Sequence, residues 1–213
     1  MLTPQQRHAG LSADLAQRAR GIELALQQGR VDEAERAGIA ALALAPRHPE
    51  ILRLSGMIQF QRGHFGAAVD TLLQALAQRA DDPMIYNALG GAYEQIGDVG
   101  RSREALRRAC ELAPELAPCW FNYARRLFAD GDGEAVVPAL QRVVALQPGH
   151  VNARAMLANI LRTDGRFAEA EVQLRGITEA NPTRAGSAWW GLAMLKPMPL
   201  TQRDIATMQR ILQ

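Results

Sequence analysis

Aromatic residues, lysine and charge of one sign are all scarce in this chain of 213 residues. Aromatic side chains make up 5% of it, and Lys196 is its only lysine. The 24 basic residues are balanced by 22 acidic ones, so the net charge is only +2, and no run of five or six like charges occurs. A nucleic-acid-binding domain would show clustered basic residues. We therefore expect no nucleic-acid partner.

Long apolar runs and the common site motifs are also lacking. No stretch approaches the roughly 18 uninterrupted apolar residues of a membrane span, which predicts a cytoplasmic protein with no membrane partner. Cys110 and Cys119 match no common metal spacing, so we expect reduced thiols and no metal or other cofactor. The chain has neither a P-loop nor a His-Glu-x-x-His pair. The sequence predicts no catalytic residue and no enzyme activity.

What the chain does contain is a strict repeat. Five glycines recur at intervals of 34 residues, at Gly29, Gly63, Gly97, Gly131 and Gly165. Prolines keep the same phase at Pro46, Pro114, Pro148 and Pro182, with Ala80 in the place of the missing one. A unit of this length cannot bury an apolar face alone and must stack on its neighbours. The repeat therefore predicts one elongated array.

Each unit has the pattern of a helical hairpin. The residues seven before and five after each glycine are mostly small, such as Gly90 and Ala68, so two helices can approach closely there. The glycines suit the left-handed position after a helix C-terminus, and the prolines end the second helix. Alanine and leucine dominate the apolar residues, which also favours an all-α fold.

The third unit carries the motif that identifies a family. It reads Tyr86-x-x-Leu89-Gly90-x-x-Tyr93, followed by Leu106, Ala109 and Pro114. This pattern resembles the tetratricopeptide repeat. The resemblance implies an α-solenoid, a right-handed superhelix, in which we expect a tail at 1–14, units near 15–48, 49–82, 83–116, 117–150 and 151–184, and a partial sixth unit with a terminal helix at 185–213. Gly38 and Arg154 depart from the motif, because the family prefers a bulky apolar residue and an aromatic residue there.

The repeat breaks near the C-terminus, where Pro199 stands in place of a sixth glycine. Thr201 and Asp204 then form a capping pair for a last helix, with Ile205, Met208 and Leu212 on one face. This uncapped apolar helix suggests that the natural polypeptide continues. The segment from Asn181 to the last helix is similar to the junction in bacterial proteins where a tetratricopeptide array precedes a sulfotransferase domain.

In tetratricopeptide arrays the first helices of successive units line a concave groove. The positions ten, six and three before each glycine form one stripe of those helices, such as Arg53, Met57 and Phe60 in the second unit. From this stripe and its neighbours we predict a binding groove of Arg53, Asn87, Glu94, Phe121, Asn122, Arg125, Asn152, Asn159, Arg162 and Trp189. The alternative for the aromatic members is packing between units, and Trp189 and Trp190 could equally bury against the last helix.

These residues favour a non-catalytic scaffold that binds a protein or an extended peptide. The asparagine amides would bond to the backbone of the ligand, and the arginines would pair with its acidic groups. The lysine clamp of chaperone-binding relatives is not expected, because Lys196 lies outside the five units. One alternative hypothesis is the substrate-recruiting arm of a sulfotransferase, whose Pro-x-x-x-Ser-Gly-Thr-like donor loop is absent from these residues. Another is self-association through the apolar face of the last helix.

Overall fold

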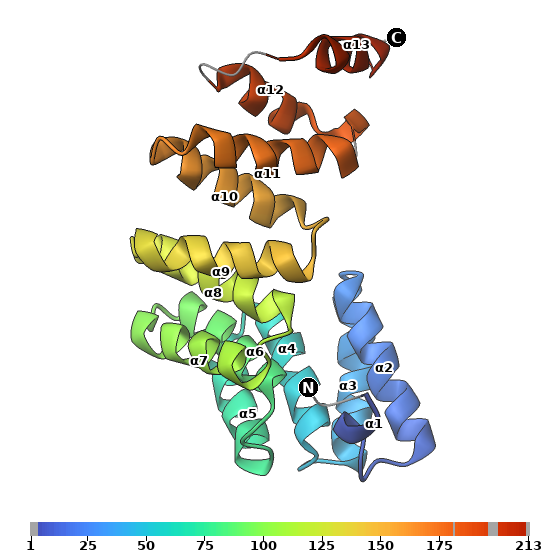
Figure 1. Ribbon diagram of the computed structural model, residues 1–213. Helices are drawn as coiled ribbons and strands as arrows, with labels where there is room; N and C mark the ends of the chain where they lie inside the picture. The colour runs from blue at the N-terminus through green and yellow to red at the C-terminus, as the bar shows by residue number, and fades with distance from the viewer. Residues whose placement is uncertain (1–3, 181, 196–199, 212–213) are drawn as a thin grey trace. The chain divides into compact units, whose positions relative to one another are not determined.

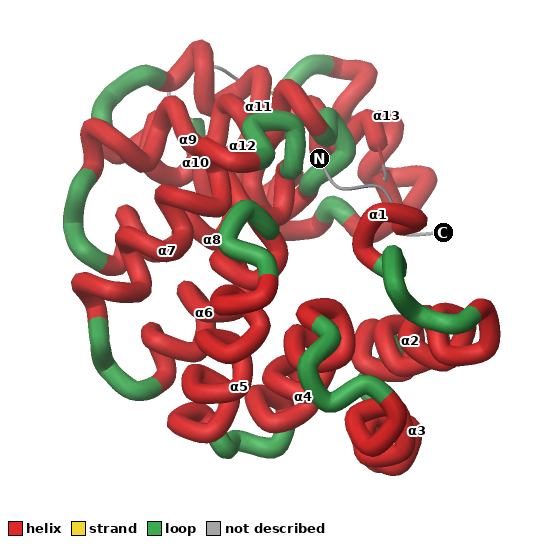
Figure 2. Tube along the Cα trace, turned by 90° about the horizontal axis from the view of Figure 1, so that it is seen from below, coloured by secondary structure: helices red, strands yellow, loops and turns green. Residues whose placement is uncertain are grey.

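The protein is all-α in the computed structural model, which describes residues 4–180, 182–195 and 200–211. None of these residues lies in a strand (Figure 2). The chain divides into two compact units, Met1–Arg126 and Leu127–Gln213, and each is described by itself. The predicted segment 196–199, with Pro199, and Leu212 of the last helix lie outside the described residues.

Unit 1 is built from helical hairpins in sequence order (Figure 1). After the short α1 (Pro4–Arg7), its helices are α2 (Ala13–Gln27), α3 (Val31–Leu44), α4 (Pro49–Gln61), α5 (Phe65–Gln78), α6 (Pro83–Gln95) and α7 (Val99–Leu112). Each helix packs on the next, and α4 also contacts α2 and α6. Helix α8 (Ala117–Ala129) begins in this unit and crosses the division.

Unit 2 continues the pattern and then departs from it. Its helices are α9 (Gly133–Leu146), α10 (Val151–Thr163), α11 (Phe167–Ala180), the 3-10 turn η1 (Pro182–Arg184), α12 (Gly186–Met194) and α13 (Gln202–Ile211). Helix α10 packs between α9 and α11, α11 packs on α12, and α13 reaches η1. The contacts run mainly between sequence neighbours, as stacking predicts.

The glycine turns confirm the hairpin prediction. All five repeat glycines have positive φ, from 70° at Gly29 to 80° at Gly63. Each follows a helix C-terminus, where a residue without Cβ adopts the left-handed conformation at low cost. The prolines Pro46, Pro114 and Pro148 follow the ends of α3, α7 and α9 and so separate one hairpin from the next.

The small residues let the two helices of a hairpin touch. A Cβ on Gly90 would lie 2.4 Å from Cγ of Leu106, so Leu106 of α7 packs directly onto the backbone of α6. Ser102 replaces the usual alanine and donates its hydroxyl to the Gly90 carbonyl at 2.8 Å. Gly38 of α3 makes a similar contact with the next hairpin, because a Cβ there would lie 2.5 Å from Cδ1 of Ile58 on α4.

Arg154 shows how the fold accommodates a departure from the motif. Trp120 donates its indole N–H to the Pro114 carbonyl at 3.0 Å. Arg154 stands 34 residues later and donates Nε to the Pro148 carbonyl at 2.6 Å. A Cβ on Gly176 would lie 2.5 Å from Nη1 of Arg154, so the guanidinium occupies the space that this glycine leaves open. The arginine therefore makes the same helix-start contact as the aromatic residue that it replaces.

Helix α13 begins with the predicted capping pair. Thr201 donates its backbone N–H and its hydroxyl to Asp204 at 2.8 and 2.6 Å, and the Asp204 N–H returns a bond to the threonine hydroxyl at 3.2 Å. Asp204 also accepts from Arg175 of α11 at 3.1 Å. This second contact ties α13 to the last hairpin.

Replacing Gly90 by alanine tests the close helix approach. Overpacking against Leu106 costs about 1–3 kcal/mol, which exceeds the gain of about 1 kcal/mol in helix propensity. We expect Gly90→Ala to lower the free energy of unfolding in a urea titration. The matched control is Gly91→Ala on the same helix, where the nearest atom of Phe60 is 3.8 Å away. A control that destabilises as much as Gly90→Ala would contradict this explanation.

Candidate functional site

Unit 1 contains a cavity of about 330 Å³ between its first helices. Helices α4, α6 and α8 form its walls, and Leu72 and Leu106 of the second helices reach its floor. We call it the asparagine groove and define it by Met57, Phe60, Asn87, Glu94, Asn122 and Arg125. All except Asn122 occupy the stripe predicted from the repeat, and Asn122 lies beside it. Phe121, also predicted, is half-buried and does not line this cavity.

Two amides bridge successive repeats in the asparagine groove. Asn122 of α8 donates Nδ2 to Oδ1 of Asn87 on α6 at 2.9 Å, and both side chains are half-buried. An amide has two donor hydrogens and an acceptor oxygen. In the described part of the chain, Oδ1 of Asn122 and Nδ2 of Asn87 have no further hydrogen bond. The pair therefore offers one acceptor and one donor side by side.

Of the two charged residues that define the groove, one has an oppositely charged partner and the other does not. Glu94 pairs with Arg126, at 3.3 Å between Oε1 and Nη1. Arg125 is exposed, and no acidic partner for its guanidinium occurs among the described residues. The groove thus carries one uncompensated positive charge beside its amide pair.

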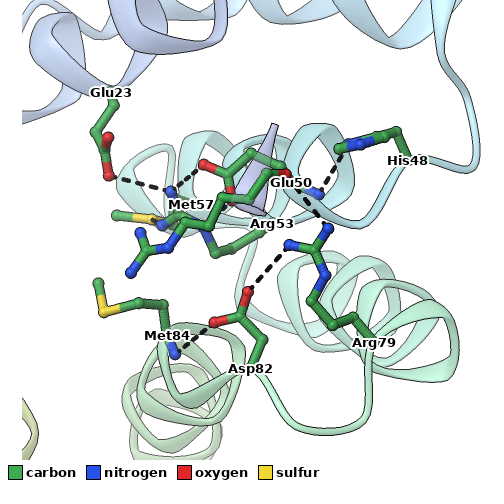
Figure 3. A network of polar contacts seen from close by, with 9 residues as sticks. Glu23, His48, Glu50, Arg53, Met57, Arg79, Asp82 and Met84 are labelled. Atoms are coloured by element: carbon green, nitrogen blue, oxygen red, sulfur yellow. Dashed lines mark hydrogen bonds and ion pairs between the residues drawn. The ribbon is translucent and has the colours of Figure 1, made fainter. Parts of the chain in front are cut away.

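The structure contradicts the predicted placement of Arg53 on the open face. Its side chain touches the wall of the cavity but is completely buried, and Figure 3 shows its polar contacts. Nη2 donates to Glu50 at 2.7 Å and to Glu23 at 3.1 Å, and Nε donates to Glu50 at 2.9 Å. The guanidinium joins α4 to α2, and its Nη1 donates to Sδ of Met57 at 3.0 Å, so each of its three nitrogens is bonded within the protein. The i,i+3 spacing of Glu50 and Arg53 is a signal for the first pair. Spacing could not reveal the second pair, because Glu23 belongs to another repeat.

Burial and pairing act in opposite directions on this cluster. Burial alone would raise the pKa of Glu50, but the hydrogen bonds and charge of Arg53 outweigh it and lower that pKa below its usual range. Burial would likewise lower the pKa of Arg53, yet Glu50 and Glu23 raise it. Glu50 therefore stays ionised at neutral pH as part of the structure.

The cluster continues to the ends of the first helices and to the N-terminal segment. Nδ1 of His48 accepts from the Glu50 N–H at 3.3 Å, while its Nε2 lies 2.9 Å from the Ala9 carbonyl. Arg79 pairs with Asp82 at 3.5 Å (Figure 3). Arg79 also donates to the Arg7 carbonyl at 3.3 Å. These contacts hold the segment around α1 against unit 1.

The predicted residues of unit 2 do not share one surface. Asn152, Asn159 and Arg162 are exposed on α10, and Arg162 donates to Oδ1 of Asn159 at 2.9 Å. Asn159 and Arg162 line a second cavity, of about 540 Å³, whereas Asn152 does not.

Trp189 is also predicted to lie in the binding groove, but the structure contradicts this, because the residue is only 8% exposed. Its indole N–H donates to the Pro182 carbonyl at 3.1 Å, seven residues before it, whereas the equivalent contacts of Trp120 and Arg154 span six. One extra residue, in the stretch containing η1, therefore shifts the register of α12. Trp190, which is 67% exposed, takes the open-face position instead. Counting from the prolines gives the same open-face position as counting from the glycines, namely Trp189, so the sequence pattern does not reveal this shift.

Neither cysteine is suited to thiolate chemistry. Cys110 and Cys119 are free and buried. Burial, followed by the nearby Cys119 and Glu111, raises the pKa of the Cys110 thiol to about 12. Burial raises the pKa of Cys119 to about 12 as well, against a smaller opposing effect of Arg7. Both are thus neutral thiols near pH 7.

Comparison with known proteins places these hairpins in a family. The tetratricopeptide repeat profiles match residues 25–92 and 127–195, and a second profile of the same family matches 85–116. The chain belongs to the tetratricopeptide repeat family, and its fold is an all-α repeat solenoid. The predicted handedness of the superhelix stays a prediction.

Individual relatives share parts of this architecture. The Vi polysaccharide export protein VexE of Salmonella typhi is 33% identical over 54% of this chain, which spans 19% of that protein. A thermophilic TPR protein of Thermus thermophilus superposes with a TM-score of 0.69 at 22% identity, over 83% of this chain and 99% of its own. YrrB, described as a TPR protein with an unusual peptide-binding site, superposes at 0.64 with 17% identity, over 83% and 89%. In the described ranges, no helix is long and apolar enough to cross a membrane.

The buried Glu50 carboxylate predicts a pH-dependent contribution to stability. Because its pKa is lowered from 4.5, this contribution is complete above pH 4.5 and is lost as the pH falls below that value. We expect Glu50→Gln to lower the free energy of unfolding at pH 7 by up to about 3 kcal/mol. The difference from the wild type should shrink in denaturant titrations below pH 4.5.

The control for this experiment is Glu33→Gln, which removes a carboxylate from an exposed pair with Arg30. Exposed pairs contribute less than about 1 kcal/mol, so this variant should behave like the wild type. A pH-independent difference between Glu50→Gln and the wild type would contradict the assignment.

Proposed function

We propose that this protein is a non-catalytic scaffold that binds an extended peptide segment in the asparagine groove. The observation that carries the proposal is the Asn87–Asn122 pair, which exposes one donor and one acceptor to a cavity shared by α4, α6 and α8. An extended peptide presents N–H and C=O groups that match such a pair. Because each amide comes from a different repeat, only the stacked array assembles the pair.

The rest of the groove is consistent with a peptide ligand. Met57 and Phe60 supply apolar contact surface, and Phe60 is itself held edge-on by Phe65 at 5.3 Å between ring centroids. Arg125 supplies the uncompensated charge, which favours an acidic side chain or carboxylate in the ligand. The peptide-binding site in the name of YrrB supports this role by analogy of fold.

Two alternatives from the sequence remain hypotheses. A sulfotransferase partner domain concerns sequence beyond Gln213, and a reading of the parent gene for a phosphosulfate loop would test it. Self-association would use the exposed face of α13, where Ile205 is 38% exposed, and would appear as a mass that rises with concentration. Location in the cytoplasm is likewise a proposal.

The double variant Asn87→Ala/Asn122→Ala tests the groove. The lost amide bond contributes about 0.5–1.5 kcal/mol to stability, so the fold should persist in circular dichroism. We expect capture of 12-residue peptides from an immobilised random-sequence array to weaken at least tenfold, about 1.4 kcal/mol.

The matched control is Asn152→Ala, which removes an exposed amide that lines neither cavity. Equal peptide capture by the double variant, the control and the wild type would reject the asparagine groove as the binding site.

A further inference from the structure

The second cavity, in unit 2, is built partly by a helix that does not follow the repeat. It lies between α10, α11 and α12 and has a volume of about 540 Å³. We call it the tryptophan cavity and define it by Asn159, Arg162, Leu174, Ile177, Trp190 and Met194. No residue of α13 lines it, so the last helix does not fill it.

Trp190 is held in an exposed position by its neighbours on α12. The adjacent Trp189 is anchored to the Pro182 carbonyl. One residue further on, Gly191 packs so closely on Leu174 that a Cβ would lie 3.1 Å from it. These two contacts fix the rotation of α12, which leaves Trp190 67% and Met194 52% exposed, one turn apart. Fixed aromatic surface of this kind is typical of binding sites.

The cavity has an apolar floor and a charged edge. Leu174 and Ile177 are buried beneath it, and Arg162 is the only charged residue of its lining among those that the structure describes. Arg162 bonds only to the neutral Asn159 within the described ranges. The neighbouring arginines of unit 2 differ, because Arg166 pairs with Glu169 and Arg175 pairs with Glu171 and Asp204.

We propose that the tryptophan cavity is a second binding site, which takes a bulky apolar side chain of a peptide whose adjacent residue is acidic. The apolar side chain lies on Leu174 and Ile177 beside Trp190 and Met194, and the carboxylate pairs with Arg162. The inference rests on the proposed function only in that its ligand is also a peptide. Charge complementarity selects the acidic neighbour, since none of the described lining residues offers a carboxylate to Arg162.

The probes are two peptides, acetyl-Gly-Asp-Phe-Asp-Gly-amide and the same peptide with lysine in place of both aspartates. The chain has 3 tryptophans, so its indole N–H signals can be followed individually by NMR and assigned with Trp190→Phe. Both peptides are titrated by following the Trp190 signal. The dissociation constant of the acidic peptide should be at least tenfold lower than that of the lysine peptide. The signal of Trp120, bonded to the Pro114 carbonyl in unit 1, should stay in place.

Arg162→Gln should remove the preference for the acidic peptide, and Arg166→Gln, at a paired arginine on the same unit, should keep it. Both side chains are exposed, so both variants should fold. The proposal is overturned if Trp190 responds equally to both peptides, if it does not respond, or if Arg162→Gln retains the preference.

The same spectra separate this proposal from the asparagine groove. Met57 and Met84 line the groove and Met194 lines the tryptophan cavity, so labelled methyl groups report on each site. The Asn87→Ala/Asn122→Ala variant should keep the Trp190 response. If this variant loses the Trp190 response, the second site is not independent and the inference is overturned. If the Trp190 signal does not respond in the wild type while the groove methyl groups do, this inference is overturned and the proposed groove still stands.

Discussion

The close approach of two helices across a glycine turn is the constraint on which this structure depends. Leu106 packs on the bare backbone of Gly90, and Leu72 does the same at Gly56. A Cβ at these two glycines would lie within 2.7 Å of the leucine Cγ, and two other repeats hold alanine at the equivalent position. Because each hairpin is thin and exposes an apolar face on both sides, it is stable only when stacked. The first helices of successive hairpins are thereby brought side by side, and any binding surface follows from that arrangement.

Stacking also determines which polar residues are structural. Arg53 and Asn87 occupy equivalent positions in successive repeats, 34 residues apart. Arg53 meets Glu50 of its own helix and Glu23 of the preceding hairpin, and these carboxylates enclose its guanidinium. Among the described residues, Asn87 bonds through its side chain only to the amide of Asn122, which leaves its donor available. The same position in the repeat can therefore hold the fold together or remain available to a ligand, depending on its neighbours.

The end of the chain shows how sensitive a helical surface is to one residue. The link from Pro182 to Trp189 is one residue longer than the link from Pro148 to Arg154. One residue rotates a helix face by about 100°. Trp189 consequently takes the buried helix-start contact and Trp190 the open face, so α12 completes a cavity with α10 and α11.

The sequence by itself determined the all-α hairpins, their glycine turns and the cap of α13, because these depend on local backbone conformation and on a period of 34 residues. It also placed Met57, Phe60, Asn87 and Arg125 on a common stripe. Tertiary structure alone decided that Arg53 is neutralised, that Asn87 and Asn122 bond to each other, and that Trp190 rather than Trp189 is exposed. The physical reason is that burial and pairing depend on residues about 30 positions apart, brought together only by stacking.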